Sequence, residues 1–252
     1  MRKTTTILVF CSLFLAACGQ NNTGGVNLKT DNLNETHDAY TVSVNIPQVH
    51  GLKNDKAQTD INAALEKIAH DQRDSFVKDA LQTPVDTATR TKSGLTIDYK
   101  GMTLSQNFIS ILFQASPYMS GAAHPNSYTF SYNYDVDTGA EIKLSDLFKP
   151  KSDYLKKLSD LSIAKLIDLS KKNQTYYDQK KQWISEGAGP KAENFKTFMI
   201  QNGELLLTFD PYQVGPYAEG DQTIEISRPE IIEILSDEGR KILSETQRTT
   251  SQ

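Results

Sequence analysis

The sequence predicts an α+β fold: antiparallel sheets with two long amphipathic helices packed against them. Short segments alternate between apolar and polar residues with the period of two typical of half-buried strands. Two longer segments carry apolar residues at helical spacing. Strands and helices follow each other in mixed order, without the regular strand–helix alternation of a parallel sheet.

The first predicted elements follow a polar stretch. Residues 19–35 are rich in Asn, Thr and Gly and predict a flexible tether, because they offer little apolar surface to bury. A strand is expected over 40–46, where Val42, Val44 and Ile46 alternate with polar residues, and Pro47 ends it. A long helix is expected over 54–81, with Asn54 or Asp55 as its N-cap.

Three further strands are predicted over 95–99, 107–114 and 127–136, forming a meander. Asp137-Thr138-Gly139 has the composition of a tight turn and predicts a reversal into a short strand over 141–144. The first half of the domain is therefore expected to be dominated by an antiparallel sheet.

The second half begins with a helix capped by Ser152 or Asp153 and running to about Leu169. The glycine- and proline-rich segment 187–190 ends the helical region. Asn202-Gly203 predicts a hairpin between strands over 195–200 and 204–209. A strand over 223–227, a helix over 230–235 opened by Pro229, and a frayed polar tail complete the chain.

The N-terminus predicts export and lipidation. Arg2 and Lys3 precede an apolar run over 6–15, which is too short to span a bilayer. Leu15-Ala16-Ala17-Cys18 resembles a bacterial lipobox, which implies cleavage before Cys18 and a membrane attachment through acyl chains on that residue. A plain secretory signal and a transmembrane anchor are the alternatives.

Composition excludes several classes of function. The formal net charge of −4 and the absence of a basic stripe argue against nucleic acid as a partner. Cys11 and Cys18 are the two cysteines, and both belong to the leader and the lipobox. A thiolate zinc site and a cysteine nucleophile are therefore not expected, and no cofactor-binding motif is visible.

Two segments carry a family resemblance. Residues 116–126 (SPYMSGAAHPN), with 132–139 (YNYDVDTG) and 144–148 (LSDLF) behind them, form the first, and residues 209–220 (FDPYQVGPYAEG) form the second. Together they are similar to the signature of the RsiV/PdaC-like extracytoplasmic domain. The resemblance covers roughly residues 40–235. It implies two intimately joined subdomains, a PdaC-like part at 37–104 and an RsiV-like part at 105–240. A signal peptide (1–17), a lipidated tether (18–36) and a disordered tail (241–252) complete the expected organisation.

The resemblance implies an envelope location and, by analogy with the anti-sigma members of the family, binding of lysozyme. In other members the domain accompanies a peptidoglycan deacetylase domain. This sequence shows neither a sigma-binding segment with a transmembrane helix nor the acidic and histidine ligands of a deacetylase metal centre. Signalling and deacetylation are therefore not expected to transfer.

Catalytic interpretations of the first motif are weak. His124 has no second histidine at metal-ligand spacing, so a hydrogen bond that ties its own turn is the favoured role. Ser120 lacks the Gly-x-Ser-x-Gly context of a hydrolase nucleophile, because Tyr118 stands where the first glycine belongs. No catalytic residue and no metal ligand are predicted.

The tyrosines of the two motifs suit a binding surface, since tyrosine buries a large area and keeps a hydroxyl for a partner. Capping of the sheet ends is the alternative role. Three nearby acids, Asp210, Glu219 and Asp221, would complement a cationic protein such as lysozyme. The predicted partner-binding residues are Tyr118, Ser120, His124, Tyr212, Pro216, Tyr217 and Glu219.

These observations together predict a lipid-anchored cell-envelope protein that binds, or inhibits, lysozyme or another cell-wall-active factor. A peptidoglycan- or glycan-modifying hydrolase and a structural envelope lipoprotein are the alternatives. Gly19 after the lipidated cysteine suits sorting to the outer membrane, facing the periplasm, in a Gram-negative cell.

Overall fold

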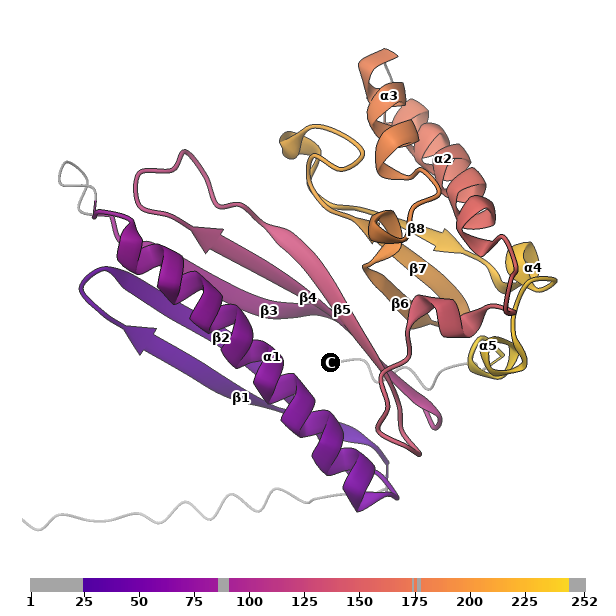
Figure 1. Cartoon of the computed structure of the whole chain (residues 1–252), viewed down its shortest axis with the longest axis horizontal. Coiled ribbons are helices and arrows are strands. Elements are labelled where there is room, and N and C mark those ends of the chain that lie inside the picture. The colour runs from indigo at the N-terminus through magenta and orange to yellow at the C-terminus, as the bar shows by residue number, and fades with distance from the viewer. Residues whose placement is uncertain (1–24, 86–90, 174, 176–177, 245–252) are drawn as a thin grey trace, which may run out of the picture.

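Two sheets of unequal size form the frame of the molecule (Figure 1). The computed structural model describes residues 25–85, 91–173, 175 and 178–244. The larger sheet has five strands in the order β1-β2-β3-β4-β5, and the smaller has three in the order β6-β7-β8. The predicted α+β class with two joined units is therefore confirmed.

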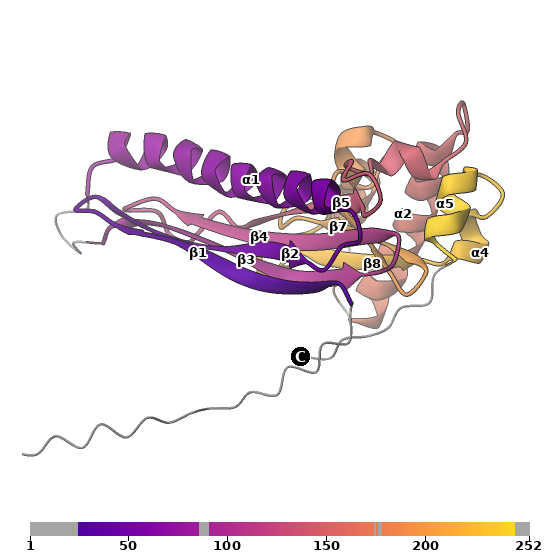
Figure 2. The same ribbon diagram turned by 90° about the horizontal axis from the view of Figure 1, so that it is seen from below.

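The first unit is β1 (Asn27–Thr36), β2 (Tyr40–His50), α1 (Asp55–Gln82), β3 (Ser93–Leu104), β4 (Phe108–Tyr118) and β5 (Tyr128–Asp135). The meander β3-β4-β5 is antiparallel, as predicted. Strands β2 and β3 pair in parallel, which the sequence analysis did not anticipate. A parallel pair needs a crossover connection, and α1 supplies it across one face of the sheet (Figure 2).

Helix α1 forms where its cap and apolar stripe predict it. The side-chain oxygen of Asn54 accepts hydrogen bonds from the amides of Lys56 (3.0 Å) and Ala57 (3.2 Å) and so satisfies two of the free donors of the first turn. The residues buried on the face toward the sheet are Ala57, Ile61, Leu65, Ala69, Phe76 and Ala80.

The predicted tether is wrong over most of its length. Residues 27–36 form β1, which pairs antiparallel with β2 from Asn27 opposite His50 to Thr36 opposite Thr41. Leu28 and Leu33 are partly buried against the core of the first unit. The polar composition misled the prediction, because β2 supplies the hydrogen bonds that hold this strand. The lipobox, Cys18 and residues 19–24 lie outside the described residues.

The second unit contains the remaining strands and most of the helices. In chain order its elements are η1 (Leu144–Leu147), α2 (Tyr154–Lys172), α3 (Asp178–Gly187), η2 (Ala192–Phe195), β6 (Phe198–Gln201), β7 (Glu204–Phe209), η3 (Tyr217–Glu219), β8 (Gln222–Ile226), α4 (Arg228–Ile231) and α5 (Asp237–Ile242). The hairpin predicted at Asn202-Gly203 is confirmed: both residues have positive φ (53° and 76°) between the paired strands β6 and β7.

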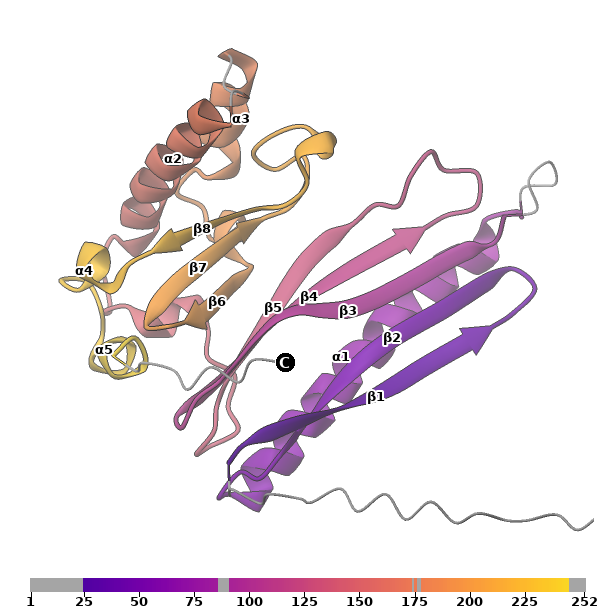
Figure 3. The same ribbon diagram turned by 180° about the vertical axis from the view of Figure 1, so that it is seen from behind.

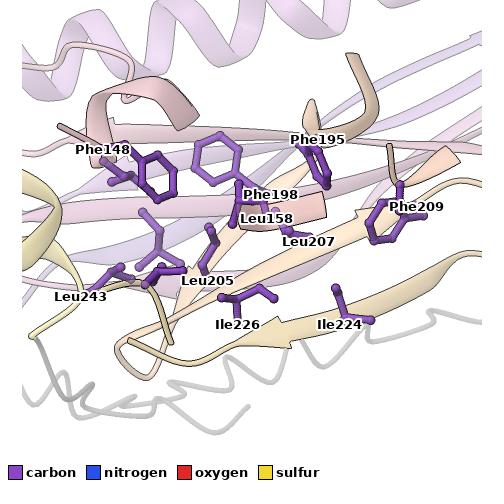
Figure 4. Close-up of a cluster of buried hydrophobic side chains, with 14 of the residues drawn as sticks. Phe148, Leu158, Phe195, Phe198, Leu205, Leu207, Phe209, Ile224, Ile226 and Leu243 are labelled. Atoms are coloured by element: carbon purple, nitrogen blue, oxygen red, sulfur yellow. The ribbon is translucent and has the colours of Figure 1, made fainter. Parts of the chain in front are cut away.

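Each unit has its own cluster of buried apolar side chains. In the second unit, Phe195, Phe198 and Phe209 pack with Leu158 of α2 and with the inward side chains of β7 and β8 (Figure 4). Phe108 belongs to this second cluster although it starts β4 of the larger sheet. The second core therefore reaches into the first unit.

Three local predictions need correction. The strand expected over 141–144 is a single bridge between Tyr134 and Glu141, after which the chain turns into η1. The helix expected over 230–235 is the shorter α4 (Arg228–Ile231), opened by a proline in its first turn. The tail does not begin at residue 241, because α5 runs to Ile242 and the side chains of Ile242 and Leu243 are buried.

The two units are joined through β6. The amide of Phe198 donates to Oγ of Ser131 (2.8 Å), and the amide of Ile200 donates to Oγ of Ser110 (3.0 Å). Nδ2 of Asn133 donates in turn to the carbonyl oxygen of Phe198 (3.2 Å). Side chains of β4 and β5 thus satisfy the free edge of β6. The boundary expected at residues 104 and 105 falls inside the β3–β4 hairpin, so β4 and β5 belong to the first unit.

Candidate functional site

Both motif-bearing loops lie at the same end of the molecule. The first connects β4 to β5 through residues 119–127, and the second connects β7 to β8 through residues 210–221 and contains η3. Figure 3 shows both loops projecting in the same direction beyond their sheets. We call the predicted aromatic, histidine, serine and proline residues on and beside these loops the loop site: Tyr118, Ser120, His124, Tyr212, Pro216 and Tyr217.

The contact between the two loops is made by His124, Pro125 and Tyr217. The rings of His124 and Tyr217 stack with their centroids 4.0 Å apart and their planes 23° apart. Oη of Tyr217 donates to the carbonyl oxygen of Pro125 (3.0 Å), which also accepts from Nδ1 of His124 (2.8 Å). His124 therefore stabilises its own turn and also stacks on the ring of Tyr217 from the second loop.

Tyr212 is an exposed tyrosine of this cluster. It is 56% exposed, and its ring lies 5.5 Å from that of Tyr217. Its φ of 69° is in the left-handed region, where a bulky residue is strained. The second loop thus holds a large apolar ring in solvent at a cost in backbone energy, a combination typical of functional positions.

The other predicted residues frame this pair. Tyr118 ends β4 opposite Gly94 and is half-buried. The amide of Ser120 donates to Oγ of Ser93 (3.0 Å), which fixes the start of the first loop to β3. Pro216 is the N-cap residue of η3, and Gly220, with a φ of 68°, ends it.

The acids of the second loop are engaged within the protein. Oδ1 of Asp210 accepts from the amide (2.6 Å) and hydroxyl (2.7 Å) of Thr129, and Asp221 pairs with Lys100 (2.8 Å). Glu219 accepts a hydrogen bond from Lys180, and its side chain is 17% exposed. These acids fasten the loop to β3, β5 and α3, so the expected display of Glu219 toward a cationic partner needs correction.

Lys180 is the residue at this site that the sequence analysis missed. It lies on α3 and is 2% exposed. Burial lowers the pKa of its ammonium group. The spacing of Lys180, Ile184 and Gly187 places all three on the buried face of α3, so the helical period alone indicates a buried lysine here.

The loop site combines a few kinds of chemical group. It offers aromatic rings, a proline and backbone groups held in fixed positions. Within the described ranges, no three or more His, Cys, Asp or Glu side chains are placed to hold a metal ion. Nor does any helix of that part of the chain have the length and apolarity to cross a membrane.

Two family models match the chain. Residues 33–127 match "Deacetylase PdaC", and residues 145–228 match "Protein of unknown function (DUF3298)". The first segment covers most of the five-stranded sheet and the first loop. The second covers the three-stranded sheet, helices α2 and α3 and the second loop. The loop site is therefore formed between the two matched segments.

Individual relatives match most of this chain. The chain is 30% identical over 199 residues to the peptidoglycan-N-acetylmuramic acid deacetylase PdaC of Bacillus subtilis, covering 79% of this chain and 40% of that protein. A DUF3298 family structure from Bacteroides fragilis matches with a TM-score of 0.64 at 17% identity, over 89% of this chain and 98% of its own.

A second DUF3298 family structure, from Pseudomonas aeruginosa, matches with a TM-score of 0.57 at 14% identity, over 85% of this chain and 95% of its own. At these identities the solved structures support the fold alone. The family models and the deacetylase relative support more: the chain resembles the PdaC-like family, with a match to the PdaC domain at residues 33–127 and to the DUF3298 domain at residues 145–228.

Proposed function

We propose that this protein is a lipid-anchored component of the bacterial cell envelope whose loop site binds a protein that acts on the cell wall, with lysozyme as the leading partner. The likeness to a peptidoglycan deacetylase supports a role connected with the cell wall. The family resemblance of the two loop motifs supports lysozyme as the partner. Acyl chains on Cys18 provide the attachment to the membrane.

The observation that carries the proposal is the exposed, strained Tyr212 beside the fixed ring of Tyr217. A protruding aromatic side chain on an immobilised loop fits a concave partner surface, and such anchors dominate binding energy at protein interfaces. Lysozyme offers a long cleft of this kind. The loop site would fill that cleft and exclude its glycan substrate.

Binding is tested by calorimetry with lysozymes of several structural classes. We expect Tyr212→Ala and Tyr217→Ala each to weaken binding by about 2 kcal/mol, roughly thirtyfold. Lys156→Ala, on the exposed side of α2, is the matched surface control and should leave affinity unchanged. Absence of binding at tens of micromolar protein to every class would refute lysozyme as the partner.

The anchor is tested separately by detergent-phase partitioning of cell extracts. Cys18→Ser removes the thiol that accepts the diacylglyceryl group, so the exported protein should leave the membrane fraction or remain unprocessed. A serine variant that is cleaved and still fractionates with membranes as the wild type does would contradict lipidation.

A peptidoglycan-modifying hydrolase is the second candidate, favoured by the name of the Bacillus subtilis relative. The chain spans 40% of that relative's length. Release of acetate or of soluble glycan from purified peptidoglycan distinguishes this candidate. Turnover that is abolished by His124→Ala in a folded protein would favour it over the binding function.

A further inference from the structure

We infer that Lys180 is a positioning residue for the loop site: through Glu219 it holds the second loop in its binding geometry without contacting the partner. The inference rests on the proposed function for its binding readout. Its structural readout is independent of any partner.

Lys180 meets the second loop at two points. Nζ of Lys180 donates a hydrogen bond to Oε2 of Glu219. It also lies beneath Gly215, where an added Cβ would come within 3.2 Å of it. The two contacts bracket Pro216 and Tyr217 in the chain. The buried ammonium group therefore defines where this stretch of the loop sits on α3.

The charge on Lys180 favours one position of the second loop over others. The Lys180 side chain is 3% exposed. A buried ammonium group is costly without a counter-ion, and Glu219 is the acidic group in contact with it. If the loop moved away from α3, the lysine would lose this counter-ion. Displaced loop conformations are therefore disfavoured more strongly than an apolar contact would disfavour them.

The link from Glu219 to the binding surface is short. Glu219 and Tyr217 both belong to η3, and the amide of Glu219 donates to the carbonyl oxygen of Pro216 (3.0 Å). Tyr217 in turn stacks on His124 and contacts Tyr212. A shift of Glu219 therefore moves the ring that connects the two loops.

The test compares Lys180→Met, Glu219→Met and the double variant carrying both. A neutral pair of similar volume removes the charge without leaving a buried ion alone, so the double variant should unfold at close to the wild-type denaturant midpoint. Each single variant leaves one charged group of the pair without its partner and should unfold at a lower denaturant concentration than the wild type. Lys156→Met, which removes the exposed pair with Asp160, is the matched control.

Hydrogen–deuterium exchange of the amides of residues 213–222 is the decisive readout. We expect exchange at least tenfold faster in Lys180→Met and in the double variant, with amides of β2 and β3 unchanged. Affinity for lysozyme should fall at least tenfold in the same two variants. Wild-type loop exchange in the double variant would overturn the inference, because an apolar pair would then hold the loop equally well.

Two further outcomes are informative. If Lys180→Met fails to fold, Glu219→Gln keeps the shape of the pair and removes its negative charge, and loop exchange at the wild-type rate in that variant would also overturn the inference. If no lysozyme binds the wild type but loop exchange responds as expected, the positioning role is supported and the proposed partner is wrong.

Discussion

At the scale of single residues, the site contains side chains in conformations and environments that their residue types usually avoid. Tyr212 adopts a positive φ that suits glycine, and Lys180 is a buried cation. Both features are stabilised by neighbouring parts of the fold. Residues of this kind determine the conformation of the loops, and Tyr212 yields a direct test.

The strain at Tyr212 predicts an order of stability. Tyr212→Gly and Tyr212→Ala both lose the ring contact with Tyr217, but glycine accepts a φ of 69° without steric cost. The glycine variant should therefore be more stable than the alanine variant by about 1 kcal/mol. Urea unfolding of the two proteins measures this difference. Equal stability would mean that the backbone at this position is relaxed.

A second test concerns two carboxylates on the outer face of the smaller sheet. A hydrogen bond with Glu225, followed by burial, raises the pKa of Glu204 from 4.5 to about 6. The folded state then binds this proton more tightly than the unfolded state, so the free energy of unfolding decreases as pH rises from about 4.5 to 6.5.

Glu204→Gln should remove most of that decrease. Because the pair is close to solvent, the effect is expected to be about 0.5 kcal/mol. Denaturant unfolding at pH 4.5 and pH 6.5 measures it, with Glu193→Gln on η2 as the matched exposed control. A variant whose stability falls with pH as steeply as the wild type would show that this pair does not share a proton.

At the scale of elements, α3 and the second loop approach unusually closely. Gly187 lies at the end of α3, and an added Cβ would sit 1.8 Å from the carbonyl oxygen of Gln213. Nε2 of Gln213 also donates to the carbonyl oxygens of Gly187 (2.9 Å) and Asn194 (3.0 Å). The backbones of the helix and the loop are therefore in direct contact, with no room for a side chain at Gly187.

Gly187→Ala should destabilise the protein by about 2 kcal/mol or more, because a rigid backbone has to move. Gly101→Ala is the matched control: its Cβ would meet Sδ of Met199 at 3.2 Å, the far end of a flexible side chain, and should cost less than about 1 kcal/mol. Equal losses of stability in the two variants would contradict the close approach at α3.

Features set by neighbouring residues could be predicted from the sequence, and features set by distant residues could not. The turn at Asn202-Gly203 and the cap at Asn54 are local, and both were predicted correctly. Strand β1 was missed because its stability comes from β2. The pairing of Lys180 with Glu219 joins residues 39 positions apart, and no local pattern encodes it. The motif tyrosines could be named from sequence, but the strain at Tyr212 could not.

At the scale of the whole molecule, the two cores are linked by buried polar contacts. Oγ of Ser110 accepts from the amide of Ile200 and donates to Oδ1 of Asn133 (2.5 Å). Phe108 extends the second core into the larger sheet. The units therefore share both apolar and polar contacts, and the whole chain is expected to unfold in a single cooperative transition.

Ser110→Ala tests the joint. It leaves a buried amide and a buried amide oxygen without partners, at an expected cost of about 2 kcal/mol or more. Ser145→Ala, at an exposed serine of η1, should change stability by less than about 0.5 kcal/mol. Chemical unfolding followed by far-ultraviolet circular dichroism measures both. A Ser110→Ala variant as stable as wild type would mean that the joint contributes little.

The outer edge of β6 limits how the two matched segments can be separated or exchanged. On this outer edge, the amides of Phe198 and Ile200 and the carbonyl oxygen of Phe198 bond to Ser131, Ser110 and Asn133 of the other unit. No further strand in the described part of the chain covers this edge. Cutting the chain between the two matched segments would open that edge to strand addition and self-association. The segments that sequence comparison separates are therefore not interchangeable modules. A new first segment could replace the old one only if it brought hydroxyl and amide groups to the same three places.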